Sequence, residues 1–327
     1  MEGVVRRLKY YHTGGFHNIN SERPVRAGAR LQAEVTSVDE SHDHGPHGSD
    51  DPRYTETWFW NAIDPVSRRV IWVHVSWLPA QKRGQHVMAV VSPKGVYRER
   101  VDTTEPLRSS LLNVEIVSPW QEMRLRSPGQ GVDLTWHAFT EAVDFGELIH
   151  LGKDMTLKHY EGAGRAKGTV QGEPFAGSGF RDRSFGPRNL RRFGRHWAVT
   201  MIGQERDVMI NVTSMWAGDL PHNAPPGLLF AFKWEEGKST IARTGIVPKR
   251  RRDASLGEVH LADGTVIQTD IANAFGQTRF ILDPNSAPKD DLTTEPAYSL
   301  LNTFLPASSP TLGPLVGWLE DGVVWNT

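Results

Sequence analysis

The sequence predicts an all-β protein built from two domains of antiparallel strands. Short segments that alternate apolar and polar residues, or are wholly apolar, recur between Gly, Pro, Asn and Asp residues. The chain contains 31 Gly and 21 Pro, spread along its length, which disfavour long helices. Its 327 residues suffice for two domains of ordinary size. Many short strands in close succession are typical of β-sandwiches and β-barrels.

The first half contains four clear strand patterns, at residues 57–64, 69–78, 85–92 and 132–139. In the second of these, alternation places Trp72 and His74 on one face, together with Val70 and Ser76. We therefore expect an aromatic ring and an imidazole to share one side of a sheet.

The second half repeats this rhythm. We expect strands at residues 196–203, 207–216 and 227–234, and hairpins that turn at residues 162–164, 262–264 and 321–322, where Gly supplies the backbone freedom of a tight turn. We place the domain boundary near residue 155, which gives domains 1–155 and 156–327 with about one barrel's worth of strands each. Residues 56–77 and 195–216 share a pattern of aromatic strand, polar turn and β-branched strand ending in Trp, which suggests an internal duplication.

Composition excludes several classes of function. The 37 Lys and Arg residues nearly balance the 38 Asp and Glu residues, so the chain carries no overall basic field that would bind nucleic acid. We expect no signal peptide, because the first residues lack an apolar run behind their charges, and no membrane span, because no run of about 18 apolar residues occurs. The absence of Cys excludes disulfides and thiolate nucleophiles and agrees with a cytoplasmic location. The oligomeric state, including a homo-oligomer, stays open.

Charge and glycine are concentrated in residues 177–188, GSGFRDRSFGPR. A phosphate-binding loop is disfavoured because the stretch lacks Lys and no helix follows it. In the favoured interpretation, Arg181 and Arg188 pair with acids such as Asp182 and Glu161 and brace the corner between the barrels. In the alternative, Asp182 is a general acid in a partly dry site. The motif positions are Gly179, Arg181, Asp182, Ser184, Gly186 and Arg188.

Two other residues join Asp182 as candidate catalytic groups. His74 shares a face with Trp72, and Glu56 precedes an aromatic strand; an imidazole or a buried carboxyl can transfer protons. With 11 Trp in the chain, we expect some to line a ligand pocket. The candidate substrate-binding residues are Trp58, Trp60, Trp72, Trp136, Trp197 and Trp216.

Residues 42–51 contain three His and three Asp that could bind a metal ion. They lie in a Gly- and Pro-containing loop without a rigid element to fix coordination geometry. We therefore interpret them as a solvated loop and predict neither a metal nor an organic cofactor.

Residues 159–188 resemble the signature of the carotenoid 1,2-hydratase (hydroxyneurosporene synthase) and AttH-like superfamily. The shared pattern is Tyr-Glu, a Gly-rich turn, Gly-Thr and then Gly-x-Gly-x-Arg-Asp-x-Ser-x-Gly-x-Arg. The resemblance implies two lipocalin-like β-barrels or half-open sandwiches, packed side by side, and a cavity for an apolar molecule. Known activities in the superfamily include water addition to isoprenoid double bonds and, in fungal relatives, pericyclic cyclisation. Arg183 stands where the family often has His, and Phe185 where it often has Trp.

These observations predict a cofactor-independent lyase or isomerase. Its substrate would be a terpenoid, steroid or polyketide-like molecule, and its reaction hydration or dehydration, isomerisation or cyclisation in an aromatic-lined pocket. The alternative is a non-catalytic carrier or sensor of a hydrophobic metabolite, which the features of the predicted pocket fit equally well.

Overall fold

The structure is a computed structural model of the whole chain. It describes residues 32–33, 35–36, 39–40, 54–144, 158–187, 195–216, 228–242, 249–250, 257–261, 263–282 and 298–324. The chain divides into two compact units, of which the first comprises Val25–Asn189 and the second includes Leu190–Thr327.

The described part of the first unit contains eleven strands and two short 3₁₀ helices. They are β1 (Gln32–Ala33), β2 (Tyr54–Asp64), β3 (Arg69–Leu78), η2 (Pro79–Gln81), β4 (Arg83–Ser92), β5 (Gly95–Thr103), β6 (Asn113–Ser118), β7 (Glu122–Ser127), η3 (Pro128–Gln130), β8 (Val132–Ala138), β9 (Ala142–Asp144), β10 (Lys158–Val170) and β11 (Glu173–Pro187).

The described part of the second unit contains ten strands and one 3₁₀ helix. They are β12 (Arg195–Gly203), β13 (Val208–Trp216), β14 (Leu228–Glu235), β15 (Lys238–Ala242), β16 (Lys249–Arg250), β17 (Gly257–His260), β18 (Val266–Thr269), η5 (Ile271–Asn273), β19 (Gly276–Leu282), β20 (Tyr298–Ser309) and β21 (Gly313–Val324). None of the helices among the described residues is long and apolar enough to cross a membrane.

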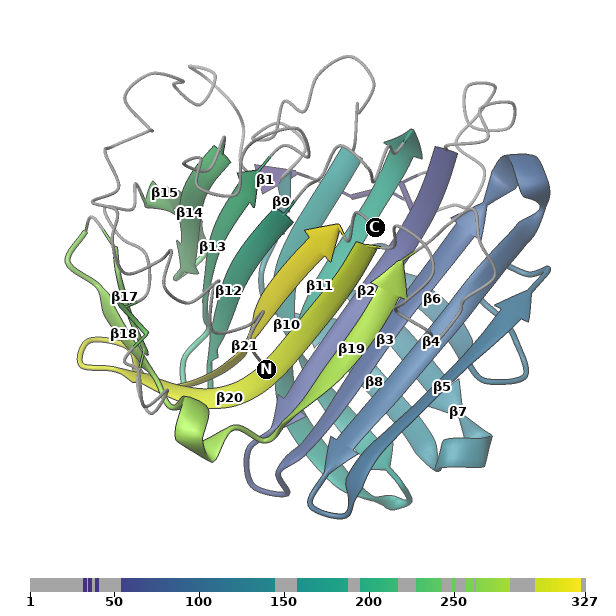
Figure 1. Cartoon of the computed structure of the whole chain (residues 1–327), viewed down its shortest axis with the longest axis horizontal. Helices are drawn as coiled ribbons and strands as arrows, with labels where there is room; N and C mark the ends of the chain where they lie inside the picture. Colours follow the sequence, from purple (N-terminus) through teal and green to yellow (C-terminus); the bar gives the residue numbers. More distant parts are fainter. Residues whose placement is uncertain are drawn as a thin grey trace. The chain divides into compact units, whose positions relative to one another are not determined.

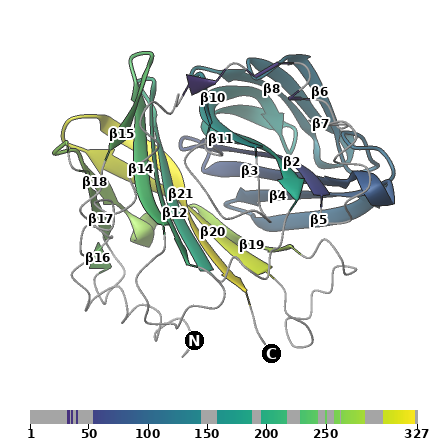
Figure 2. The ribbon, with the colours of Figure 1, turned by 90° about the horizontal axis from the view of Figure 1, so that it is seen from above.

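Each unit is built on one strongly curled antiparallel sheet (Figure 1, Figure 2). The first sheet has the order β5-β4-β3-β2-β11-β10-β8-β7-β6, with β9 added beside β10 and β1 beside β9. The second has the order β15-β14-β13-β12-β21-β20-β18-β17-β16, with β19 beside β20. The predicted all-β class is confirmed.

The two sheets share one topology, which is the physical counterpart of the duplication seen in the sequence. Each begins with a meander of four consecutive strands, β2 to β5 or β12 to β15. The last hairpin of each sheet, β10–β11 or β20–β21, then returns to pair beside the first strand of that meander. The similar segments 56–77 and 195–216 fall on the equivalent strands β2–β3 and β12–β13.

The first unit extends further along the chain than the boundary near residue 155 implies. β10 and β11 follow that point, yet they occupy the middle of the first sheet, between β2 and β8. The first unit therefore ends at Asn189. Strand rhythm alone did not reveal this, because a returning hairpin looks the same whichever sheet it joins.

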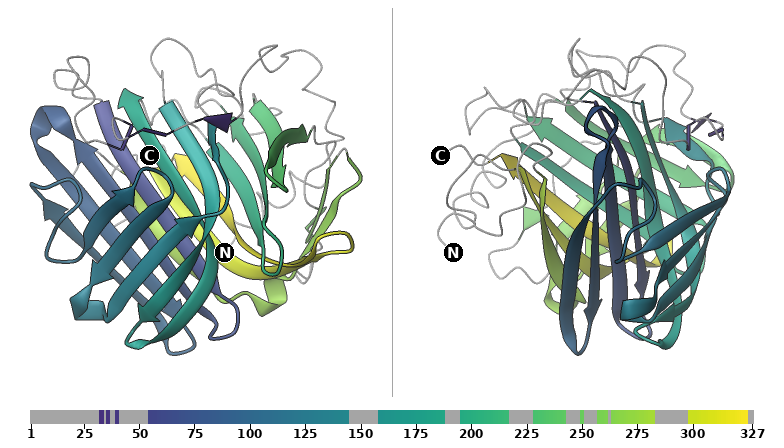
Figure 3. Two further views of the ribbon diagram at one scale, coloured as in Figure 1. Left: turned by 180° about the vertical axis from the view of Figure 1, so that it is seen from behind. Right: turned by 90° about the vertical axis from the view of Figure 1, so that its right-hand side faces the viewer.

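The hairpin expected to turn at residues 162–164 turns elsewhere. β10 runs straight through these positions, and the chain reverses at Gln171 and Gly172, whose φ angles of 56° and 75° suit a tight hairpin turn. Gly162 and Gly164 are needed for another reason: a Cβ on them would come within 2.6 Å of ring atoms of Trp120 and Trp136, respectively. These glycines let two indoles pack directly against β10. Figure 3 shows the curled sheets from behind and from one side.

The turn expected at residues 321–322 is also wrong. β21 continues to Val324, and Asp321 and Gly322 pair with Leu301 and Leu300 of β20. The Asp-Gly dipeptide is therefore overridden by the twelve-pair ladder between these two strands. The hairpin turning at residues 262–264 is confirmed, with Gly264 at a φ of 87°.

The core of the first unit lies on one face of its sheet, which we call the inner face. Its main cluster combines aliphatic side chains with Trp58, Trp60, Trp77 and Trp136, all buried. Because side chains alternate along a strand, the odd-numbered residues of β11 from Phe175 to Phe185 point to this same face. Two of them are arginines, which the core must accommodate.

The second unit has its own core, formed by buried aliphatic side chains from β12, β13, β14, β17, β18, β20 and β21. Among the described residues of this unit, the buried polar side chains are those of Thr, Asn and Ser, and none is charged. The two related sheets thus differ in their interiors, and the buried arginines distinguish the first.

His86 couples the stability of the first unit to pH. Its ring is fully buried, with Nδ1 2.9 Å from Ser109 Oγ and Nε2 2.8 Å from the carbonyl oxygen of Pro106. Burial lowers the pKa of His86 from 6.5 to about 4. Between these values the unfolded chain binds a proton more readily than the folded one, so we expect the free energy of unfolding to fall as pH drops from 6.5 to 4, by about 3 kcal/mol in total.

Urea unfolding at a series of pH values measures this slope. The variant His86→Gln removes the titrating group, and its free energy of unfolding should change less steeply with pH in this window. Equal slopes for the variant and the natural protein would contradict the assignment.

Arg183 and Glu56 supply a second stability prediction. Arg183 Nη2 lies 2.5 Å from Glu56 Oε2, and both side chains are 0% exposed. Removing one partner leaves an uncompensated buried charge, so Glu56→Gln should lower the free energy of unfolding by about 3–5 kcal/mol. The control Glu115→Gln breaks an exposed pair with Arg126, 3.9 Å apart, and should cost less than about 1 kcal/mol. Equal losses in the two variants would show that the buried pair is unimportant.

Candidate functional site

The outer face of the first sheet, opposite its core, brings the candidate functional groups together. The central strands β3, β2, β11 and β10 lie side by side (Figure 1). Cross-strand pairing aligns His74 with Phe59, Phe59 with Asp182, and Asp182 with Glu161. These four side chains therefore form one row across the four strands, with neighbouring strands about 4.8 Å apart.

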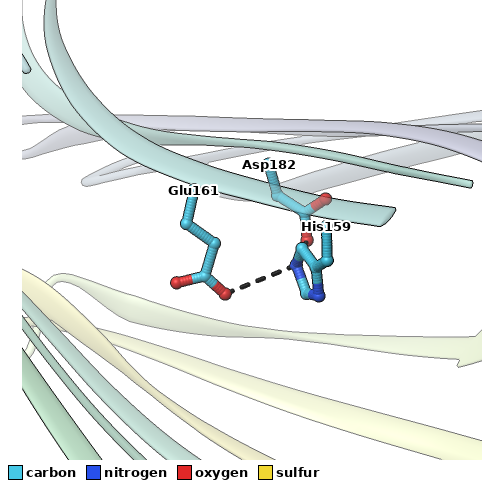
Figure 4. Close-up of side chains that lie close together, drawn as sticks. All are labelled: His159, Glu161 and Asp182. Carbon is cyan, nitrogen blue, oxygen red and sulfur yellow. Dashed lines mark hydrogen bonds and ion pairs between the residues drawn. The ribbon is translucent and has the colours of Figure 1, made fainter. Parts of the chain in front are cut away.

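The polar end of this row is a cluster of three side chains, His159, Glu161 and Asp182. We call this cluster the triad (Figure 4). His159 Nε2 lies 2.8 Å from Asp182 Oδ2 and 3.4 Å from Glu161 Oε1. His159 and Glu161 are two residues apart on β10 and so share a face, and Glu161 pairs directly with Asp182. The triad is thus a product of strand alternation and register alone.

The triad is only partly enclosed. The side chain of Glu161 is 7% exposed, whereas those of His159 and Asp182 are 19% and 20% exposed. A small molecule or water can therefore approach the imidazole and one carboxylate, while the second carboxylate lies deeper.

The other end of the row is aromatic. The rings of Trp72 and His74 stack, with centroids 6.2 Å apart and an interplanar angle of 18°. Phe59 contacts Trp72 edge-on at 5.5 Å and Phe180 at 5.9 Å. All four side chains are buried. A proton-transferring group therefore lies beside a patch of aromatic rings on one face of one sheet.

This arrangement can do two kinds of chemistry. An imidazole hydrogen-bonded to a carboxylate can give and take a proton, and the second carboxylate can accept a proton from water. One ligand atom from each triad residue also lies within 4.8 Å of the others, close enough for all three to bind one metal ion.

The three predicted catalytic residues do not form one site. His74 and Asp182 share the outer face, but Glu56 points to the inner face, where it pairs with Arg183. The strand parity of residue 56 on β2 places it on the same side as Trp58 and Trp60.

The predicted pairing of Arg181 with Asp182 or Glu161 is wrong. Arg181 points to the inner face and donates from Nη2 to Glu40, while Asp182 points outward to His159. Adjacent residues of a strand face opposite sides, so Arg181 cannot bridge to its neighbour. Arg188 lies outside the described residues.

The remaining motif residues support the strand rather than a loop. A Cβ on Gly179 would lie 1.8 Å from the carbonyl oxygen of Asn61, so glycine permits the close approach of β11 to β2. Ser184 exchanges a hydroxyl contact of 2.7 Å with Thr57 of the same neighbouring strand. Gly186 has a φ of 141°, a backbone conformation that favours glycine.

The predicted substrate-binding tryptophans divide between the two faces. Trp72 lies on the outer face beside His74, whereas Trp58, Trp60 and Trp136 are packed in the inner core. Trp197 and Trp216 belong to β12 and β13, but their side chains lie outside the described residues, as does the His- and Asp-rich segment 42–51.

Sequence reasoning considered Glu161 only as an ion-pair partner and did not select His159. The spacing His-x-Glu within a strand places His159 and Glu161 on one face. Pairing that strand in register with the strand of Asp182 would have indicated the triad. Finding this register requires the position of the hairpin turn, and a turn at residues 162–164 gives the wrong partners.

A family model described as a domain of unknown function, DUF7064, matches residues 38–230. No curated protein matches the chain. Kievitone hydratase from Nectria haematococca has a similar solved structure, with a TM-score of 0.53 and 10% identity over 85% of this chain and 91% of that one. An AttH protein from Nitrosomonas europaea gives a TM-score of 0.56 and 12% identity over 93% of this chain and 100% of that one. This likeness shows the fold, and the expected AttH-like, lipocalin-like fold is confirmed.

Proposed function

The chain belongs to the DUF7064 family, and we propose that it is an enzyme that adds water to, or removes water from, a hydrophobic small molecule. The observation that carries this proposal is the contact of 2.8 Å between His159 Nε2 and Asp182 Oδ2 beside the rings of Phe59 and Phe180 on the same face. A proton-transfer pair next to an apolar aromatic patch suits a reaction at a carbon–carbon double bond.

In the forward direction, the pair of His159 and Asp182 gives a proton to one carbon of the double bond. Water attacks the other carbon, and Glu161, the deeper carboxylate, accepts the proton that the water loses. The reverse sequence removes water. Aromatic rings attract cations through their π-faces, so Phe59 and Phe180 stabilise positive charge that develops on the substrate.

Of the catalytic residues predicted from the sequence, His74 also has a role in the proposed reaction. It lies in the same row as Asp182, on the far side of Phe59, and its ring is backed by Trp72. We assign it to binding a polar group of the substrate at the far end of the aromatic patch. Glu56 has no part in this reaction, because it faces the core.

The aromatic patch and the fold support the proposed substrate class. A terpenoid, steroid or polyketide-like molecule offers both an apolar body and a double bond, and the similar structure of kievitone hydratase belongs to a hydratase. Isomerisation or cyclisation of such a molecule would use the same proton-transfer pair. A carrier would need the aromatic patch but not the triad, so the triad favours the enzyme.

The proposal is tested by incubating the protein with a panel of terpenoid, steroid and polyketide alkenes in water labelled with ¹⁸O. We expect the label to appear in a product that mass spectrometry identifies as hydrated, and Asp182→Asn and His159→Gln to lower the rate by about 100-fold or more while the fold is retained. Recovery of every bound compound unchanged would instead indicate a carrier.

The matched control is His137→Gln. His137 Nδ1 lies 3.8 Å from Glu122 on the same sheet, but its side chain is 57% exposed. This variant also removes an imidazole next to a carboxylate, and it should keep the natural rate. A loss equal to that of His159→Gln would contradict the assignment. Full activity of protein shown by elemental analysis to be metal-free would establish that the triad transfers protons without a metal.

A further inference from the structure

We propose a second binding site on the inner face of the first sheet, in which Arg181 binds the carbonyl oxygen of a small neutral molecule. The site is separate from the triad, because Arg181 and Asp182 point to opposite faces of β11. It does not depend on the proposed reaction.

Arg183, on the same face of β11, is an arginine with a purely structural role in this core and serves as the comparison for Arg181. Arg183 is fully buried, and each of its three nitrogens has a partner. Nε donates to the carbonyl oxygen of Asp39 at 2.9 Å, Nη1 to those of Thr57 and Ser184 at 3.2 and 3.0 Å, and Nη2 to Glu56 at 2.5 Å. Each nitrogen of the Arg183 guanidinium group therefore already donates a hydrogen bond within the protein.

Arg181 lies two residues away on the same face and is equally buried, but its capacity is mostly unused. Nη2 donates to Glu40 Oε1. Nε and Nη1 have no hydrogen-bond partner among the described residues. Leaving a buried donor of a charged group without an acceptor is unfavourable, so two such nitrogens on one side chain require an explanation.

The surroundings of Arg181 supply more donors than acceptors, although Glu40 Oε2 is also buried without a partner among the described residues. The Arg181 guanidinium lies over the rings of Trp60 and Trp120, at 5.9 and 4.9 Å from their centroids. The indole nitrogens of Trp60 and Trp136 are buried without a partner among the described residues. Trp136 is near Arg181 because its ring lies over Gly164, two residues along β10 from Gly162, which pairs with Arg181. The four unpartnered donor nitrogens of Arg181, Trp60 and Trp136 thus outnumber this one acceptor, which favours a ligand with an acceptor oxygen.

Charge decides which oxygen fits. The two buried arginines are already balanced by Glu40 and Glu56, so a carboxylate would add an uncompensated charge to a fully buried place. A neutral carbonyl oxygen accepts from Arg181 without that cost, and the indoles of Trp60 and Trp120 provide apolar walls for the rest of the molecule. We therefore assign the ligand to the class of small aromatic or aliphatic ketones and related carbonyl compounds.

The site is closed in this structure, since Arg181 is 0% exposed. A ligand enters only when an indole beside the guanidinium turns aside. Binding should therefore change the environment of these indoles, which gives a direct signal.

The test compares acetophenone with ethylbenzene, which has a similar shape but no acceptor oxygen. In the natural protein, the indole N–H resonances of Trp60 and Trp136 should shift on adding acetophenone, and acetophenone should bind about 10- to 100-fold more tightly than ethylbenzene. Equal affinities, or a crystal structure grown with acetophenone that shows only an ordered water at Arg181, would overturn the proposal.

Two double variants test whether the preference for acetophenone over ethylbenzene depends on Arg181. Arg181→Met with Glu40→Gln removes the unused donors without leaving a buried charge, and the preference for acetophenone should disappear. Arg183→Met with Glu56→Gln removes the neighbouring pair at the same depth, and the preference should persist. If either variant fails to fold, the resonance shifts of the natural protein still decide. A preference retained without Arg181 would contradict the assignment.

Discussion

The register between β10, β11 and β2 is the constraint on which the other features of the first unit depend. It is continuous from Val170↔Glu173 at the turn to Lys158↔Phe185, and it extends into β2 without a bulge. Because successive side chains of a strand face opposite sides, a shift by one residue would send Arg181 and Arg183 outward and bury Asp182 in the core. The register therefore separates the structural ion pairs of the inner face from the triad of the outer face.

The two faces use charge in different ways. On the inner face, Arg183 is stacked over Trp58 at 4.0 Å and bonded to Glu56, so its charge is tolerated because it is paired and its nitrogens have acceptors. On the outer face, Glu161 and Asp182 are directly opposed carboxylates, a pairing that repels unless a third group lies between them. His159 takes that position, and the partial exposure of the cluster leaves it open to a reactant.

Much of the fold could be predicted from the sequence, because alternation in segments such as residues 69–78 directly reports a strand with two distinct faces. The same alternation correctly joined Trp72 and His74. The candidate site could be predicted only in part: Asp182 was recognised from its motif, but its partner was not. Glycine was read as a turn signal at residues 162–164, whereas Gly162 and Gly164 make room for Trp120 and Trp136. The partners of a strand residue depend on where the hairpin turns, and contacts distant in the sequence, such as Arg181 with Glu40, leave no local pattern.

The central claim is that the outer face of β10 and β11 is the reactive face and that the inner ion pairs are not. A crystal structure of the protein with the hydrated product bound tests it most directly. We expect the new hydroxyl within about 3 Å of a carboxylate oxygen of Asp182 or Glu161, with the apolar body over Phe59 and Phe180. A product bound with its hydroxyl at Glu56, on the inner face, would contradict the account.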